Sequence, residues 1–278
     1  MKRQLLLCLA IISFLSNSGF AQKAKIAAAD KKYNSYAYID AIQTYERLAE
    51  KGYQSVEMFE KLGNAYYFNS DFEKAVQSYE KLYQLQSELA PEYFYRYAQS
   101  LKAIGKEKEA ATILAKFENK SSDDSRSKRL KNNTDYLEDI KANVGIYTIE
   151  NAGINSKYSD YGSAIVDNKL IFTSARDTGG VGQRKHAWTG EHFTNLYAAG
   201  VNGELIPSNP VRYDANVNSK FHEATPVFTK DGNTMYFVSD REGDKRSTDI
   251  YMVQKNGKKW GEAKLLPDSI NSLGRETT

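Results

Sequence analysis

LGNAYYFNSDFEKAVQSY, residues 62–79, is the stretch that decides the fold of the first half of this 278-residue chain. Large apolar residues recur in it at helical spacing, and Asn69–Asp71 interrupts them with a turn. Ala75 and Tyr79 are four residues apart, so they share one helical face. Because a small residue on such a face lets another helix approach closely, the stretch predicts a helical hairpin.

The same pattern recurs on both sides of this stretch. Three alanines stand 34 and 35 residues apart, and each precedes a large apolar residue by four positions: Ala41 and Tyr45, Ala75 and Tyr79, Ala110 and Leu114. Ala98 also repeats the place of Gly63 at a distance of 35. The spacing predicts three stacked hairpins over 22–124, with a degenerate first helix, and then a capping helix and linker over 125–145. A plain helical bundle is the alternative, which the recurring spacing disfavours.

This half resembles the tetratricopeptide repeat, whose signature positions are matched by Leu62, Gly63, Tyr66, Ala75 and Tyr79. The resemblance implies an α-solenoid with a concave groove, built from the first helix of each repeat, that binds peptides and performs no chemistry.

The predicted groove carries six residues: Glu60, Asn64, Tyr67, Tyr95, Gln99 and Lys102. Some members of the family clamp a terminal carboxylate with an asparagine and several basic residues. Asn64 fits that role, but Gln99 stands where a basic residue would help and Glu60 would repel the ligand. We therefore do not expect a carboxylate clamp, and a merely solvated face remains the alternative.

A second repeat fills the C-terminal half, where short alternating strands replace the helical periodicity. The triplets 154–156, 217–219 and 270–272 each read apolar-Asn-Ser. Leu170–Arg176 matches Met235–Arg241, and Asn195–Tyr197 matches Asp249–Tyr251.

 Each of these two matched triplets is followed five residues later by Asn-Gly, which favours a tight hairpin between strands. The pattern predicts two units of four short strands.

These units resemble the blades of a Tol-type, WD-repeat-like β-propeller, and the match is fullest over Glu223–Tyr251. The first unit departs from it, because Ser163 replaces a proline and Ala175 replaces an aspartate. We expect an incomplete propeller over 146–278, with blades at about 157–219 and 220–272 and the start of a third blade at the C-terminus. Two blades cannot close a ring. We therefore expect a longer protein of which this is the N-terminal part, and self-association that completes the ring is the alternative.

The first 21 residues are typical of a secretory signal peptide. Lys2 and Arg3 precede an apolar run from Leu5 to Leu15, and Gly19–Ala21 offers small residues for cleavage before Gln22. The run is too short to span a membrane comfortably, since a span needs about 20 residues. We expect an exported protein, periplasmic and associated with the outer membrane, with no transmembrane segment after cleavage. Cys8, the one cysteine, lies within the segment removed.

The charge balance argues against nucleic acid as a partner. The chain has 38 Lys+Arg and 35 Asp+Glu. Removing Lys2 and Arg3 leaves 36 basic residues against 35 acidic ones, and nucleic-acid binding needs a basic face.

The order of signal peptide, tetratricopeptide repeats and Tol-type propeller is similar to a group of Bacteroidetes envelope proteins of the OmpA family, some linked to type IX secretion. The resemblance implies a non-catalytic scaffold that binds envelope proteins or peptides through the repeat groove and the propeller face. It implies attachment to peptidoglycan only through a C-terminal domain that this sequence does not contain. The alternative is the non-catalytic repeat portion of a larger secreted hydrolase or peptidase.

A long loop over 177–192 is the remaining candidate for binding. Its side chains suited to an acidic or aromatic partner group are Arg184, Lys185, His186 and Trp188. A loop that only packs on the rest of the protein is the alternative. We predict no catalytic residue, no cofactor and no metal site, because no motif for nucleophilic, nucleotide or zinc chemistry has its required spacing.

Overall fold

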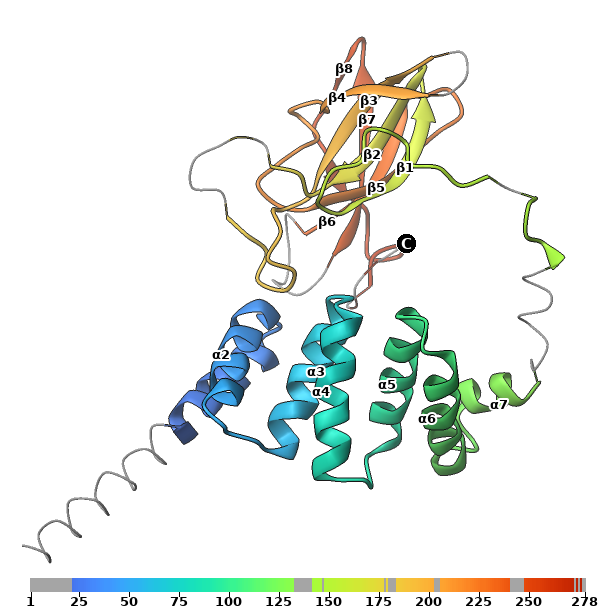
Figure 1. The fold of residues 1–278 in the computed structure, drawn as a ribbon. Coiled ribbons are helices and arrows are strands. Elements are labelled where there is room, and N and C mark those ends of the chain that lie inside the picture. The colour runs from blue at the N-terminus through green and yellow to red at the C-terminus, as the bar shows by residue number, and fades with distance from the viewer. Residues whose placement is uncertain are drawn as a thin grey trace, which may run out of the picture. The chain divides into compact units, whose positions relative to one another are not determined.

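The computed structural model shows helices followed by antiparallel sheets, which confirms the expected order of α and β structure (Figure 1). It describes residues 22–132, 142–146, 148–177, 179, 184–202, 206–240, 248–272, 274 and 276. Contacts divide the chain into two compact units. The helical unit runs to Ile146 and also includes Ala187–Thr189, and the β unit comprises Tyr147–His186 and Gly190–Thr278. The predicted signal peptide, 1–21, lies outside the described residues.

The helical unit begins with a helical segment over 22–34. The helices that follow it are α2 (Tyr38–Glu50), α3 (Val56–Phe68), α4 (Phe72–Leu85), α5 (Pro91–Ala103), α6 (Glu107–Lys120) and α7 (Ser125–Asn132). Their starts follow from the sequence. The Ser55 hydroxyl accepts a hydrogen bond from Met58 N at 3.2 Å, Asp71 caps α4 by accepting from Lys74 N, and Pro91 occupies the first turn of α5. Among the described residues, none of the helices combines the length and the apolar character needed to cross a membrane.

From α2 to α6 each helix packs against the next one in the chain, and small residues are buried in the stack. Ala41, Ala75 and Ala110 are all fully buried. A Cβ atom on Gly63 would lie only 2.6 Å from the Tyr79 ring, so any side chain at position 63 would clash with that ring unless the ring moved. The first helix, although degenerate in sequence, buries Ala29 completely.

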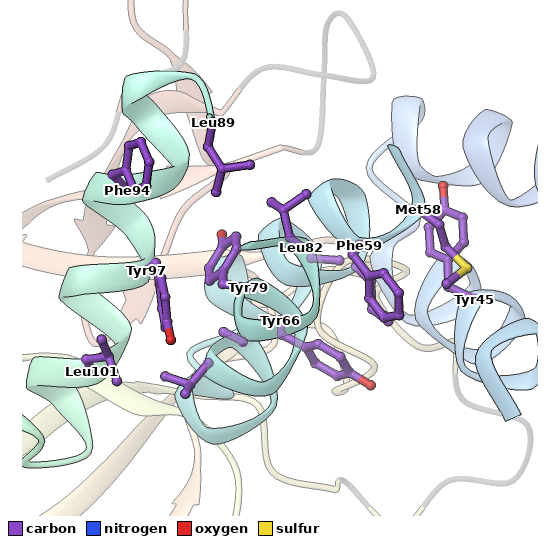
Figure 2. Close-up of a cluster of buried hydrophobic side chains, with 14 of the residues drawn as sticks. Tyr45, Met58, Phe59, Tyr66, Tyr79, Leu82, Leu89, Phe94, Tyr97 and Leu101 are labelled. Carbon is purple, nitrogen blue, oxygen red and sulfur yellow. The ribbon is translucent and has the colours of Figure 1, made fainter. Parts of the chain in front are cut away.

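The core of the helical unit is aromatic and runs through the stack (Figure 2). Tyr79 and Tyr97 approach each other across neighbouring helices with ring centroids 5.9 Å apart. The largest fully buried side chains of this unit are Tyr45, Met58, Tyr79, Leu82, Phe94, Leu101 and Phe117. Burial of large rings contributes most of the apolar area that holds such a stack together.

The β unit contains two antiparallel sheets. The first has the order β1 (Asp160–Val166), β2 (Lys169–Ser174), β3 (Asn195–Val201) and β4 (Pro207–Arg212). The second has the order β5 (Glu223–Phe228), β6 (Thr234–Ser239), β7 (Asp249–Asn256) and β8 (Lys259–Trp260), with β9 (Lys264–Leu265) also paired to β7. Each sheet therefore follows the chain as a meander.

The two sheets correspond strand by strand. Asp160 pairs with Ser174 as Glu223 pairs with Ser239, and a register shift follows in both first strands. The turn at Asn256-Gly257 has a Gly257 φ of +63°, as a tight hairpin between β7 and β8 requires.

Residues between the sheets form the main core of the β unit: Ile171, Leu196, Ala198, Val217, Met235, Phe237, Tyr251, Val253 and Trp260. Two polar contacts join the sheets as well. Thr225 N donates to Thr173 Oγ1 at 2.9 Å, and Lys255 Nζ lies 3.0 Å from Asp167 Oδ2. One face of the first sheet is thus covered by the second.

Several predicted features lie outside the described residues. These are residues 133–141 of the capping helix and linker expected over 125–145, Gly203 of the first Asn-Gly turn, Arg241, and Arg275, Thr277 and Thr278 of the expected third blade.

Candidate binding site on the helical unit

The predicted groove residues come from two helices, at positions that share one face of each. Glu60, Asn64 and Tyr67 stand at i, i+4 and i+7 in α3. Tyr95, Gln99 and Lys102 have the same spacing in α5. All except Asn64 are partly exposed, and Asn64 is only 6% exposed.

Asn64 is held by its neighbours on three helices. Its Oδ1 accepts a hydrogen bond from the Tyr79 hydroxyl at 2.8 Å and another from Arg96 Nη1 at 2.8 Å. Its side chain also bonds to the Tyr33 hydroxyl. An asparagine that is saturated in this way is fixed in orientation, so it positions Arg96 and Tyr33 at the surface.

Arg96 is the basic residue that our sequence analysis missed on this face. Its Nε lies 3.0 Å from Glu92 Oε1, and its guanidinium lies over the Phe68 ring at 4.9 Å from the centroid. The 35-residue spacing of the repeat could have predicted Arg96. Lys61 stands 35 residues earlier and makes the equivalent pair with Glu57, at 2.6 Å.

A second arginine stacks on aromatic rings further along the unit. The Arg126 guanidinium lies 4.3 Å from the centroid of the Tyr95 ring and 5.0 Å from that of Phe117. It also pairs with Glu92 at 2.9 Å and with Asp124 at 2.9 Å. The hydrogen bonds that Arg126 donates to Asp124, first from its side chain and then from its backbone N–H, lower the pKa of Asp124 to about 2. We call Asn64, Tyr67, Tyr95, Arg96 and Arg126 the arginine–aromatic face.

Glu60 is not a free charge at the edge of this face. The Tyr93 hydroxyl bonds to its carboxylate, and burial raises the pKa of Glu60. Burial and the adjacent Glu60 together raise the pKa of Tyr93 to about 12. The repulsion expected of Glu60 is therefore lessened by a neutral hydroxyl group beside it.

The loop residues are divided between the two units. Arg184 lies over the Phe193 ring at 5.0 Å, Lys185 forms an isolated β-bridge with His192, and the His186 ring lies 4.7 Å from that of His222. These three belong to the β unit.

Trp188 belongs to the helical unit, where it lies among aromatic side chains. Its ring is stacked on Tyr36 at 5.7 Å with an interplanar angle of 7°. It meets Tyr38 edge-on at 4.9 Å and Phe68 at 6.3 Å. Trp188 was predicted to be part of a binding loop, but nothing in the sequence predicted these contacts, since Phe68 is 120 residues away.

His222 is a partly buried histidine of the β unit. Its Nδ1 accepts a hydrogen bond from Thr194 N at 3.1 Å, and its Nε2 is buried without a hydrogen-bond partner. Burial, together with nearby His186, lowers its pKa to about 4 despite the opposing effect of Asp240. The ring is therefore neutral at pH 7 and accepts from the backbone of Thr194, the residue just before β3.

The arginine–aromatic face presents arginine and aromatic side chains that are suited to binding. In the part of the chain that the structure describes, no three His, Cys, Asp or Glu side chains come together as metal ligands would. Within the arginine–aromatic face Asn64 accepts from Arg96, and Glu92 pairs with both arginines. The rings of Tyr67 and Tyr95 are partly exposed. Arginine and aromatic side chains are enriched at protein interfaces.

No protein-family model matches the chain, and no curated protein matches it significantly.

Proposed function

We propose that this chain is a non-catalytic scaffold of the bacterial envelope that binds other proteins through the arginine–aromatic face of its helical unit. In this proposal the helices form a tetratricopeptide-type solenoid and the sheets are blades of a Tol-type propeller. The protein is exported to the periplasm and associates with the outer membrane, in keeping with its resemblance to Bacteroidetes envelope proteins.

The observation that carries the proposal is the stacking of Arg96 and Arg126 on aromatic rings of successive hairpins. Such pairs are rigid, because hydrogen bonds and ion pairs hold each guanidinium in place. A rigid array of arginines and aromatic rings loses little entropy on binding, and these residue types supply most of the binding energy at protein interfaces.

Repeated construction supports the helical part of the proposal. The Tyr45 hydroxyl donates to Asp30 at 2.5 Å and the Tyr79 hydroxyl donates to Asn64 at 2.8 Å, and the members of the two pairs are 34 residues apart. The same bond thus joins the two helices of successive hairpins, as a 34-residue repeat requires.

Site-specific photocrosslinking in the source cell tests this function. A photoreactive amino acid is placed at Gln99 or Lys102, which flank the face, and at exposed Ala111 of α6 as the control. We expect one envelope protein to be crosslinked from Gln99 and Lys102 but not from Ala111, and Tyr95→Ala to remove the product. Equal labelling at all three positions would contradict the proposal, as would peptide turnover by the purified chain without binding of any envelope component.

A further inference from the structure

The Trp188 site uses backbone groups that helices leave unpaired at their ends. The Trp188 indole Nε1 donates to Phe68 O at 3.3 Å, and Phe68 is the last residue of α3. Ile39 N, in the first turn of α2, donates to Ala187 O at 3.3 Å. Because the first N–H groups and the last C=O groups of a helix lack partners within it, this site satisfies both kinds of group.

Tyr36 has a backbone conformation that a tyrosine rarely adopts. Its φ is +61°, in the left-handed region. The equivalent turns of the next two hairpins place Ser70 at +58° and Gly105 at +77°, at distances of 34 and 35 residues. A position that suits glycine thus carries a large aromatic residue in the first hairpin, and strain of this kind is typical of ligand-binding positions.

The ring of Tyr36 explains that choice. It lies parallel to the Trp188 indole, while Tyr38, only 4% exposed, closes the site from the edge. Phe68 completes the site and is also the ring on which Arg96 stacks. The Trp188 site, made by Tyr36, Tyr38 and Phe68, is therefore continuous with the arginine–aromatic face.

We propose that the Trp188 site is a receptor for a tryptophan-bearing segment of a partner protein, and that Ala187–Thr189 is its resident occupant. The partner inserts an indole between Tyr36 and Tyr38, donates the indole N–H to Phe68 O and accepts from Ile39 N with the preceding carbonyl group. Trp188 competes with it, so partner binding is weakened by the fraction of molecules in which the site is filled. The inference goes beyond the proposed function, since it rests on residues outside the arginine–aromatic face.

Binding of a labelled peptide tests the receptor. The probe is a fluorescein-labelled peptide with the sequence of residues 185–193, KHAWTGEHF, and its control has alanine in place of the tryptophan. By fluorescence anisotropy we expect the Trp188→Ala chain to bind the probe about 10-fold or more tightly than the unaltered chain does, as removal of a competing tryptophan anchor implies. The alanine peptide should bind neither chain.

A matched variant separates loss of the site from loss of the fold. Tyr36→Gly removes the stacking ring while it places the residue best suited to a positive φ at that turn. In the Trp188→Ala background it should abolish probe binding and leave the circular dichroism of the helices unchanged. Binding that survives Tyr36→Gly would overturn the proposal, as would equal affinity of the probe for the unaltered and Trp188→Ala chains, or no binding to either.

A second measurement uses the chain without any substitution at Trp188. Its two tryptophans are labelled with 5-fluorotryptophan, and Trp260→Phe assigns their ¹⁹F resonances. Excess unlabelled probe should shift the Trp188 resonance alone, and no shift at saturating probe would contradict displacement. If the Trp188 resonance does not shift while crosslinking from Gln99 persists, the Trp188 receptor is rejected and the proposed function is unaffected.

Discussion

Two buried asparagines perform the same task in successive sheets. Asn218 accepts from Leu196 N at 2.8 Å and donates to Leu196 O at 3.0 Å, and Asn271 accepts from Ile250 N at 2.8 Å and donates to Ile250 O at 3.1 Å. Leu196 and Ile250 are the second residues of β3 and β7. The recurrence of Asn-Ser in the sequence thus reflects a side chain that pairs with a strand end as a neighbouring strand would.

Asn218→Ala should destabilise the β unit by about 1–3 kcal/mol, because it removes the acceptor of the buried Leu196 N–H, while Leu196 O still accepts from Tyr213 N. Asn155→Ala is the matched control. Asn155 has the same place in the repeat, but it is exposed and its Oδ1 accepts from Ala152 N, an exposed backbone group, so its loss should cost less than about 0.5 kcal/mol. Urea unfolding followed by Trp260 emission, in a Trp188→Phe background, measures both. Equal costs would show that the side-chain bonds contribute nothing.

His222 makes the β unit sensitive to mild acid. Its pKa is about 4 when folded against an ordinary 6.5, so between these values the unfolded chain binds the extra proton and stability falls as the pH falls. The loss should approach roughly 3 kcal/mol at most. His222→Asn keeps an acceptor for Thr194 N and should flatten the urea stability profile between pH 6.5 and 4. A profile unchanged by that substitution would refute the assignment.

At the scale of the helices, small residues set how closely the hairpins pack. Ala110 is fully buried, whereas its neighbour Ala111 in α6 is exposed. Ala110→Leu should therefore cost about 1–3 kcal/mol through overpacking, and Ala111→Leu less than about 0.5 kcal/mol. Urea unfolding followed by far-ultraviolet circular dichroism compares the two. If both variants unfold at one urea concentration, the packing role of the repeated alanine is wrong.

The sequence predicted this helical packing because the spacing of small and large residues is local information. It did not predict Arg96, since reasoning from groove positions selected Gln99, one turn later on α5, and overlooked the pair that repeats Glu57 and Lys61. The unusual turn at Tyr36 could have been predicted from the sequence, because aligning Tyr36 with Ser70 and Gly105 shows a tyrosine where the backbone favours glycine. The contacts of Trp188 could not have been predicted in this way, because they join residues far apart in the chain.

At the scale of the whole molecule, both units contain repeated features, but the repeats are not identical. The first and second hairpins keep the hydroxyl bonds of Tyr45 and Tyr79, while the third has Leu114 at that position. The sequence predicted the change from helices to sheets near residue 146, because the hydrophobic period changes there. The sequence did not predict which surface binds a partner, because a solvated face and a binding face have the same hydrophobic periodicity.

Sedimentation of the native protein from envelope extracts tests the central claim, that this chain is a protein-binding scaffold, most directly. The unaltered protein is compared with a double variant, Tyr67→Phe and Tyr95→Ser, at two partly exposed positions, and far-ultraviolet circular dichroism checks that the helices of the variant are folded. We predict that the unaltered protein sediments in a complex well above its own mass and that the double variant does not. Identical sedimentation of the two at the mass of the protein alone would contradict the account.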